Sequence, residues 1–241
     1  MAQLVRVDRT LLRDRAYDAI KAAVVDGELA PGQTIRDVDL AARLGLSRAP
    51  VREALARLAD EGLVESKPQS WTRVTPLVVS DVRDAATVVR AMQEVAVRKA
   101  VPRVTEAAIN LMRDHNARFA EAVRRGDVDE AIAADDSLHD VLVSICGNRA
   151  VADTIDRYTP LIRRLERQRF GSLPGLRSIS IHERLIEACA ARDVATAVSV
   201  TTRMWSVLEE LAADGRNAAD STTPPTELRV PRRPKGDPSE D

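Results

Sequence analysis

Aromatic residues and cysteines are scarce in this chain. Phe, Trp and Tyr make up 2% of the 241 residues, so any hydrophobic core has to be built from aliphatic side chains. The two cysteines, Cys146 and Cys189, lie far apart inside apolar helical patterns, which predicts buried thiols in a reducing compartment and no disulfide framework. No stretch resembles a signal peptide or a membrane-spanning helix. We therefore expect a cytoplasmic protein without a membrane partner.

An excess of charge of one sign is also lacking. The chain has 36 basic and 37 acidic side chains, and residues 1–75 have 12 basic and 11 acidic ones. This balance provides no general attraction to nucleic acid, so any DNA binding must come from local positive surfaces, paired in a dimer. The length is sufficient for one or two domains with cores of their own.

Two short helices separated by one tight break are predicted within residues 37–62. Apolar positions of the first helix share one face, and Gly45 can adopt the left-handed conformation that ends a helix. Ser47 is a suitable N-cap for the second helix. Arg48 and Arg52 lie off the apolar stripe at the start of that helix. This is the helix-turn-helix arrangement, which places a recognition helix in the major groove of DNA.

An alternating pattern after the second helix predicts a β-hairpin. Residues 63–67 alternate like a half-buried strand, residues 68–70 can turn the chain, and residues 71–75 can return as the partner strand. A hairpin beside a recognition helix makes a winged helix. The side chains of this wing expected near the phosphate backbone are Lys67, Gln69, Ser70 and Arg73. A purely structural helical hairpin is the alternative, which the arginines and the wing together disfavour.

The rest of the chain is predicted to be helical and then disordered. Helical periodicity begins after Ser80, a plausible N-cap, and glycine- or proline-containing breaks divide it into about six helices, with Asp127 and Asp193 as further N-caps. The last segment is rich in proline and lacks an apolar face, which is typical of disorder. The predicted fold is mainly α. It consists of a winged helix-turn-helix domain with a β-hairpin wing at residues 9–76, an all-α bundle at residues 80–213 and a disordered tail at residues 214–241.

The N-terminal third closely resembles the GntR family of bacterial transcription regulators. The matching segments are residues 29–32, 40–41, 44–55 and 61–64. The resemblance implies that Arg48 and Arg52 contact operator DNA. Trp71 replaces a glycine that the family usually has in the wing, and we expect its ring to pack under the hairpin. The full set of expected DNA-binding residues is Arg36, Ser47, Arg48, Ala49, Arg52, Lys67, Gln69, Ser70 and Arg73.

The helical region resembles the ligand-binding (FCD) domain of the FadR subfamily of these regulators, which binds small effectors, usually carboxylates, inside a helical bundle. The matching segments are residues 90–94, 135–139, 147–148 and 182–186, followed by residues 192–193 and 197. The resemblance implies a homodimeric regulator, expected to be a repressor, with operator DNA and a small organic acid as partners. The implied effector-binding residues are Arg90, Asp135, His139 and His182.

Three of these residues could also hold a metal ion. Asp135 and His139 are four apart, so their side chains project from one helix face. Carboxylate and neutral imidazole suit zinc, nickel or manganese, and His182 would be the third ligand. Many members of the subfamily have another histidine at the position of Met204, whose thioether is a poor ligand for zinc or manganese. The alternative is that both histidines are hydrogen-bonded pocket residues and Asp135 pairs with an arginine.

Other functions remain open at this point. A metal-dependent hydrolase could use Asp135, His139 and His182 with an open fourth position, and a helical adaptor would use the bundle only for protein contacts. Arg90 could clamp an effector carboxylate or pair with Glu94 on its own helix. The dense run Arg163, Arg164, Arg167 and Arg169 is interpreted as a solvated or dimer-edge face, outside any site.

Overall fold

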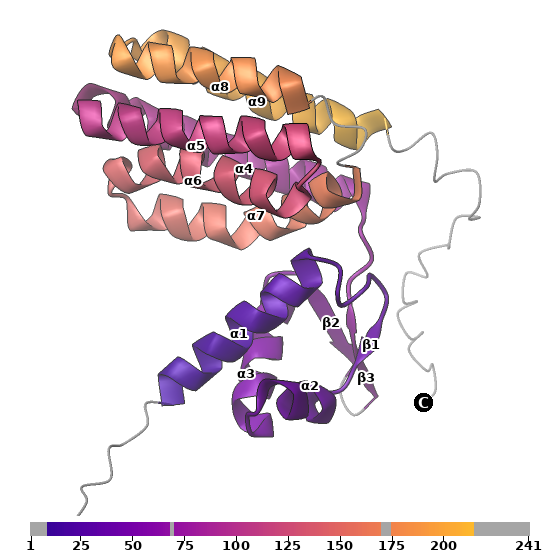
Figure 1. Ribbon diagram of the computed structural model, residues 1–241. Coiled ribbons are helices and arrows are strands. Elements are labelled where there is room, and N and C mark those ends of the chain that lie inside the picture. Colours follow the sequence, from indigo (N-terminus) through magenta and orange to yellow (C-terminus); the bar gives the residue numbers. More distant parts are fainter. Residues whose placement is uncertain (1–8, 68–69, 170–174, 215–241) are drawn as a thin grey trace, which may run out of the picture.

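The computed structural model describes residues 9–67, 70–169 and 175–214. Figure 1 shows a small N-terminal unit beneath a stack of long helices, with one extended segment joining them. Gln69 of the predicted wing and the predicted tail from residue 215 onward lie outside the described residues. None of the described helices has the length and apolarity needed to cross a membrane.

The N-terminal unit has the predicted helix-turn-helix. Its helices are α1 (Arg9–Val25), α2 (Asp37–Leu44) and α3 (Arg48–Asp60). Gly45 ends α2 with a left-handed φ of 63°, and Ser47 precedes α3 with an extended backbone, as the sequence predicted. Ile20, Val51 and Leu58 are each at most 1% exposed, because the apolar stripes of α1 and α3 face each other.

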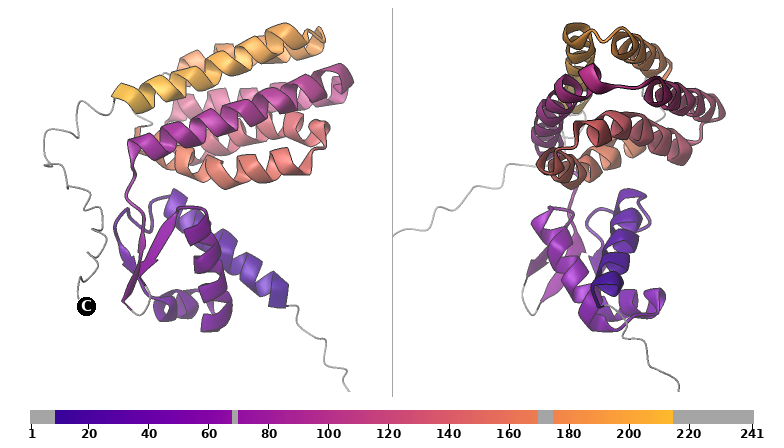
Figure 2. Two further views of the ribbon diagram at one scale, coloured as in Figure 1. Left: turned by 180° about the vertical axis from the view of Figure 1, so that it is seen from behind. Right: turned by 90° about the vertical axis from the view of Figure 1, so that its left-hand side faces the viewer.

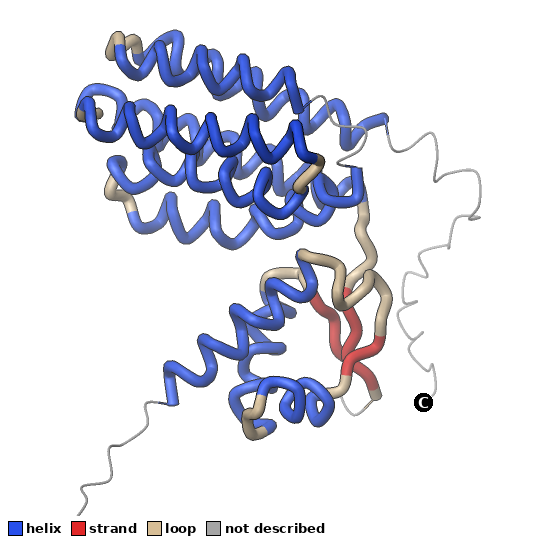
Figure 3. The backbone as a smooth tube through the Cα atoms, in the orientation of Figure 1, coloured by secondary structure: helices blue, strands red, loops and turns tan. Residues whose placement is uncertain are grey.

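The wing has one more strand than predicted. Strands β2 (Val64–Lys67) and β3 (Trp71–Val74) pair antiparallel, with Val64 opposite Val74, as the alternation indicated. The additional strand is β1 (Thr34–Ile35), which pairs with the other edge of β3. Figure 3 shows the three strands side by side. A strand of two residues is too short to show an alternating pattern in the sequence. It is recognised only from its pairing with β3 in the structure.

The C-terminal unit is a bundle of six α-helices in the described residues, as predicted. They are α4 (Val79–Ala100), α5 (Glu106–Arg125), α6 (Val128–Cys146), α7 (Arg149–Arg169), α8 (Gly175–Ala190) and α9 (Val194–Asp214), with a 3-10 turn η1 (Val101–Arg103) after α4.

Two of the three predicted N-caps of the bundle are confirmed. Asp127 accepts a hydrogen bond from the backbone N–H of Glu130, and Asp193 accepts one from that of Thr196. The prediction for Ser80 is wrong, because α4 already begins at Val79 and its extended N-cap residue is Val78.

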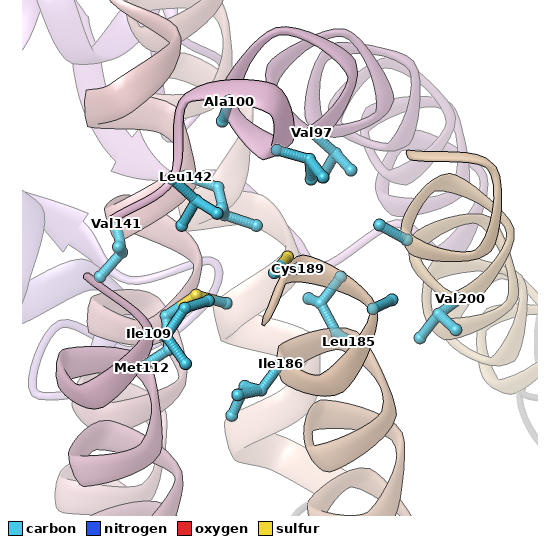
Figure 4. Close-up of a cluster of buried hydrophobic side chains, with 14 of the residues drawn as sticks. Val97, Ala100, Ile109, Met112, Val141, Leu142, Leu185, Ile186, Cys189 and Val200 are labelled. Atoms are coloured by element: carbon cyan, nitrogen blue, oxygen red, sulfur yellow. The ribbon is translucent and has the colours of Figure 1, made fainter. Parts of the chain in front are cut away.

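The bundle core is aliphatic, as the scarcity of aromatic residues requires. Figure 4 shows side chains of five helices converging on one cluster, among them Val97, Met112, Leu142 and Leu185. Cys189 is part of this cluster and Cys146 belongs to a neighbouring one, and both are free buried thiols, as predicted. Burial raises the pKa of the Cys189 thiol to about 12.

Helix α7 is the bundle helix that meets the N-terminal unit, as the views of Figures 1 and 2 agree. Leu161 of α7 packs against the hydrophobic core of the N-terminal unit and also against a core cluster of the bundle. Polar contacts surround it. Lys21 donates to the backbone oxygen of Asp156 at 3.3 Å, and Arg157 donates to that of Asp60 at 2.6 Å.

Candidate functional sites

The residues predicted to read DNA are exposed at the start of α3. Arg48 donates to the carboxylate of Asp37 in the first turn of α2, with a shortest separation of 3.0 Å, and this bond lowers the pKa of Asp37. Arg52, one turn further along α3, makes no hydrogen bond to any described residue. Arg36 is exposed and lies 3.9 Å from Asp39. Ser47 and Ala49 of the predicted set are exposed as well.

The predicted DNA-binding residues of the wing differ in exposure and in side-chain contacts. Lys67 and Ser70 are exposed. Arg73 is half-buried, since its guanidinium lies 4.2 Å from the centroid of the Trp71 ring and also pairs with Glu65. The Trp71 ring therefore stacks against the Arg73 guanidinium within the wing. This contact restricts the conformations in which Arg73 could contact DNA.

The candidate metal site brings together Asp135 and His139 of α6 and His182 of α8. One ligand atom from each lies within 4.8 Å of the other two. Asp135 Oδ1 is 3.2 Å from His182 Nε2 and 3.9 Å from His139 Nε2. Ligands bound to one zinc ion at about 2.0–2.1 Å stand roughly 3–3.5 Å apart. The three side chains fit a metal ion after small adjustments.

Asn116 of α5 fixes the orientation of His182. The Asn116 amide nitrogen donates to the backbone oxygen of Ile179 at 3.4 Å, which leaves its oxygen 3.0 Å from His182 Nδ1. The roles of the two ring nitrogens depend on the tautomer: with the proton on Nε2 the ring donates to Asp135, and with the proton on Nδ1 it donates to Asn116 and turns the Nε2 lone pair towards Asp135. In the second tautomer the Nε2 lone pair can bind a metal ion beside the Asp135 carboxylate. Asn116 was missed in the sequence, where a lone asparagine inside an amphipathic helix gives no signal.

The protonation states of the site suit a metal ion. Burial lowers the pKa of His139 to about 4 despite the nearby carboxylate of Asp135, so the imidazole is neutral at pH 7. Burial alone would raise the pKa of Asp135, but Arg163 and the hydrogen bond to His182 hold it well below its usual range. A neutral imidazole and an ionised carboxylate are the forms that bind divalent metals.

The interpretation of the arginine run as a solvated face is wrong for Arg163 and Arg164, which are buried. Arg163 is 7% exposed, donates to Asp135 Oδ2 at 2.6 Å, and also pairs with Asp136 and Glu166. These three carboxylates hold the pKa of Arg163 well above its ordinary value, although burial acts to lower it. Arg163 thus leaves Asp135 Oδ1 facing the two histidines.

The next two arginines of α7 contact the N-terminal unit. Arg164 is 5% exposed and donates to the backbone oxygen of Thr75 at 2.6 Å, where the chain leaves the wing. Arg167 pairs with Asp26 at the end of α1 at 2.8 Å. The side chain of Arg169 lies outside the described set. One helix therefore contacts both the candidate metal site and the N-terminal unit.

Two further residues considered in the sequence, Met204 and Arg90, are not part of the three-residue candidate metal site. Met204, at the position of the usual fourth ligand, is partly buried against the aliphatic cluster of Figure 4. The next residue, Trp205, is 5% exposed, with its ring centroid 6.4 Å from that of His139. Arg90 is half-buried on α4, and its role as a carboxylate clamp stays a prediction.

Each of the two units matches a known protein family. Residues 12–74 match the family described as "Bacterial regulatory proteins, gntR family", and residues 84–207 match the FCD domain. Over 159 residues the chain is 25% identical to the HTH-type transcriptional repressor RspR of Escherichia coli K12, covering 66% of this chain and 70% of that protein. It is 30% identical over 135 residues to the Nta operon transcriptional regulator of Aminobacter aminovorans, covering 55% and 63%.

The arrangement of the elements also has a solved counterpart. The E. coli protein McbR/YncC superposes with a TM-score of 0.76 at 18% identity, over 89% of this chain and all of that one. At this identity the likeness concerns the fold alone.

Proposed function

Because the chain belongs to the GntR family and carries an FCD domain, we propose that this DNA-binding transcription regulator is a repressor released from its operator by a small carboxylate. One relative is a repressor by name. The family consists of transcription regulators and not enzymes, so the hydrolase alternative is abandoned.

The exposed start of α3 supports the DNA-binding part of the proposal. In a homodimer, two such helices would enter successive major grooves of an inverted repeat, with Arg48 and Arg52 contacting base edges and phosphates. Lys67 and Ser70 of the wing would contact the adjacent backbone. The Arg48–Asp37 ion pair is exposed and can exchange for a phosphate contact at little cost.

The three-residue site supports the effector part. Asp135, His139 and His182 would hold a divalent metal, which supplies a positive centre for an oxygen of the effector carboxylate. The thioether of Met204 leaves the fourth position of a tetrahedral site to that oxygen or to water. Zinc, nickel and manganese all accept this donor set.

The observation that carries the proposal is the sequence of contacts along α7. Arg163 contacts the site carboxylate Asp135, while Arg164 and Arg167 contact Thr75 and Asp26 of the DNA-binding unit. A ligand that changes the charge around Asp135 would change the ion pairs of Arg163, and Arg164 and Arg167 of the same helix contact the DNA-binding unit. Effector and operator would then favour different placements of the DNA-binding units, so their binding is mutually unfavourable.

Purified, tag-free protein is expected to contain about one equivalent of divalent metal, and His139→Ala is expected to lose it. Elemental analysis by inductively coupled plasma mass spectrometry measures this directly. Chelation should also lower the melting temperature of the wild type but not that of His139→Ala, because metal bound to the folded state stabilises it. His115→Ala is the matched control, since His115 lies outside the metal-ligand group. Equal metal in the wild type and His139→Ala would contradict the assignment.

Small carboxylates are expected to weaken operator binding by about 5–150-fold, the usual range for allosteric coupling. Fluorescence anisotropy with a duplex selected by the protein from random DNA, titrated with and without acetate, succinate and citrate, measures the change. The response should disappear in His139→Ala while operator affinity without ligand is kept. If no carboxylate changes operator affinity and none stabilises the protein, the helical domain serves protein contacts instead, as an adaptor would.

A further inference from the structure

The chain passes from the DNA-binding unit to the bundle through residues 75–78, which form neither helix nor strand (Figure 1). Thr75 belongs to the DNA-binding side, because its backbone N–H donates to the Leu63 oxygen at 3.1 Å. Leu77 belongs to the bundle side, because it packs against a core cluster of the bundle. Pro76, between them, makes no hydrogen bond to any described residue. The orientation of the DNA-binding unit therefore depends on the backbone around Pro76 and on the contacts that bridge it.

Arg164 of α7 makes the most buried polar contact across this junction. The residue is 5% exposed. Its Nη2 donates to the backbone oxygen of Thr75 at 2.6 Å, and its Nη1 donates to Thr75 Oγ1 at 3.1 Å. The Thr75 hydroxyl in turn donates to the backbone oxygen of Gly62 at 2.8 Å, just beyond the end of α3. One threonine therefore connects Arg164 to the end of the recognition helix.

The other polar contacts between the two units are more exposed. Lys21 and Arg157 each donate to one backbone oxygen of the opposite unit, and both hydrogen bonds are exposed to solvent. Arg167 pairs with Asp26, whose side chain is 52% exposed. Water and salt weaken contacts of this kind. Arg164 therefore makes the polar contact that is best placed to hold the DNA-binding unit in one orientation.

The buried guanidinium of Arg164 has no ion pair with a carboxylate in the described part of the chain, whereas its neighbour Arg163 has three. Burial lowers the pKa of Arg164, and no neighbouring acid opposes this effect. A buried cation that contacts only neutral oxygens is incompletely compensated for its lost hydration. The docked orientation therefore gains two hydrogen bonds but loses hydration of a charge, which limits its advantage over a released orientation.

We propose that Arg164 is a positioning residue that holds the DNA-binding unit through Thr75 and so determines which spacing of operator half-sites the dimer accepts. This inference rests on the proposed function, in which two such units bind an inverted repeat. Units held in one orientation fit one spacing, because each inserted base pair moves a half-site by about 3.4 Å along the DNA and roughly 34° around it. Units that turn freely about Pro76 fit several spacings.

A series of duplexes with altered spacing tests this role. The full-length protein is titrated by fluorescence anisotropy with the selected operator and with duplexes whose half-sites are moved apart or together by one or two base pairs. The wild type is expected to lose about tenfold or more in affinity at a shift of two base pairs, because its second unit no longer reaches its half-site. Arg164→Ala is expected to lose about threefold or less relative to its own affinity for the original operator.

Further variants separate positioning from a general effect on the fold. Thr75→Val removes one of the two acceptors of Arg164 and should give an intermediate dependence on spacing, whereas Thr75→Ser keeps the hydroxyl and should behave as the wild type. Arg149→Ala is the control, because Arg149 forms an exposed ion pair at the start of the same helix. Loss of structure alone would lower the melting temperature and weaken binding to every duplex by the same factor.

The dependence on spacing decides the inference separately from the proposed function. A wild type that accepts every spacing equally would overturn the inference, and so would an Arg164→Ala variant as selective as the wild type. If Arg164→Ala does not fold, equal selectivity of Thr75→Val and Thr75→Ser would overturn it. If a carboxylate still releases the operator in those cases, the proposed function stands. Lost selectivity in Arg164→Ala, with no effect of any carboxylate, would sustain the inference and contradict the proposed function.

Discussion

Replacing Arg52 with alanine is expected to remove most of the sequence-specific affinity for operator DNA while leaving the protein folded. Arg52 is exposed on the first turns of α3 and makes no hydrogen bond within the described residues, so its loss leaves no buried group unpaired. An arginine bound to a guanine edge contributes about 1–3 kcal/mol. Two copies act in a dimer, and the affinity should fall by at least about 30-fold.

Fluorescence anisotropy against the selected operator and against a scrambled duplex measures this effect. Arg98→Ala is the control, since it removes the same charge from an exposed position of the bundle helix α4. The specific affinity should fall towards the nonspecific one in Arg52→Ala and stay unchanged in Arg98→Ala. Undiminished discrimination between the two duplexes in Arg52→Ala would contradict the placement of α3 in the major groove.

Removing Arg163 is expected to have the largest effect on stability. Its side chain is 8% exposed, and its guanidinium pairs with Asp135, Asp136 and Glu166. Taking one partner out of a buried ion pair leaves its carboxylates uncompensated and costs about 3–5 kcal/mol. Arg163→Ala should lower the free energy of unfolding by about this amount, as measured by urea denaturation.

Two further variants test whether the loss of stability comes from the uncompensated carboxylates. Arg149→Ala breaks the exposed Arg149–Asp153 pair on the same helix and should change stability by about 0–1 kcal/mol. Asp135→Asn added to Arg163→Ala should restore part of the loss, because it removes one of the stranded charges. A loss below about 1 kcal/mol in Arg163→Ala would mean that these carboxylates do not depend on Arg163.

Local patterns were sufficient for most elements but not for the contacts between them. The left-handed Gly45, the caps Asp127 and Asp193, and the alternation of β2 and β3 depend on neighbouring residues and were predicted correctly. Strand β1 exists only because β3 offers it a free edge, and β3 begins 36 residues later in the chain. The start of α4 was missed because it has no side-chain cap.

The sequence likewise predicted the three possible ligands of the candidate metal site but not the residues that contact them. The i, i+4 spacing placed Asp135 and His139 on one helix face, and the family resemblance supplied His182, which the structure places beside them. Asn116 and Arg163 come from two other helices, and their burial follows from how those helices pack. A signal for Arg163 did exist: Glu166 follows three positions later, a spacing at which the two side chains of a helix can pair.

Leu161 is a single hydrophobic side chain shared by two cores, and this has a consequence for thermal denaturation. One leucine, the Arg167–Asp26 ion pair and a few hydrogen bonds are a small part of the contacts inside either unit, so little cooperativity is transmitted between them. A two-state treatment of the whole chain is then inappropriate, since the smaller unit can lose its structure while the bundle persists. The temperature at which operator recognition fails need not be the temperature at which the effector domain melts.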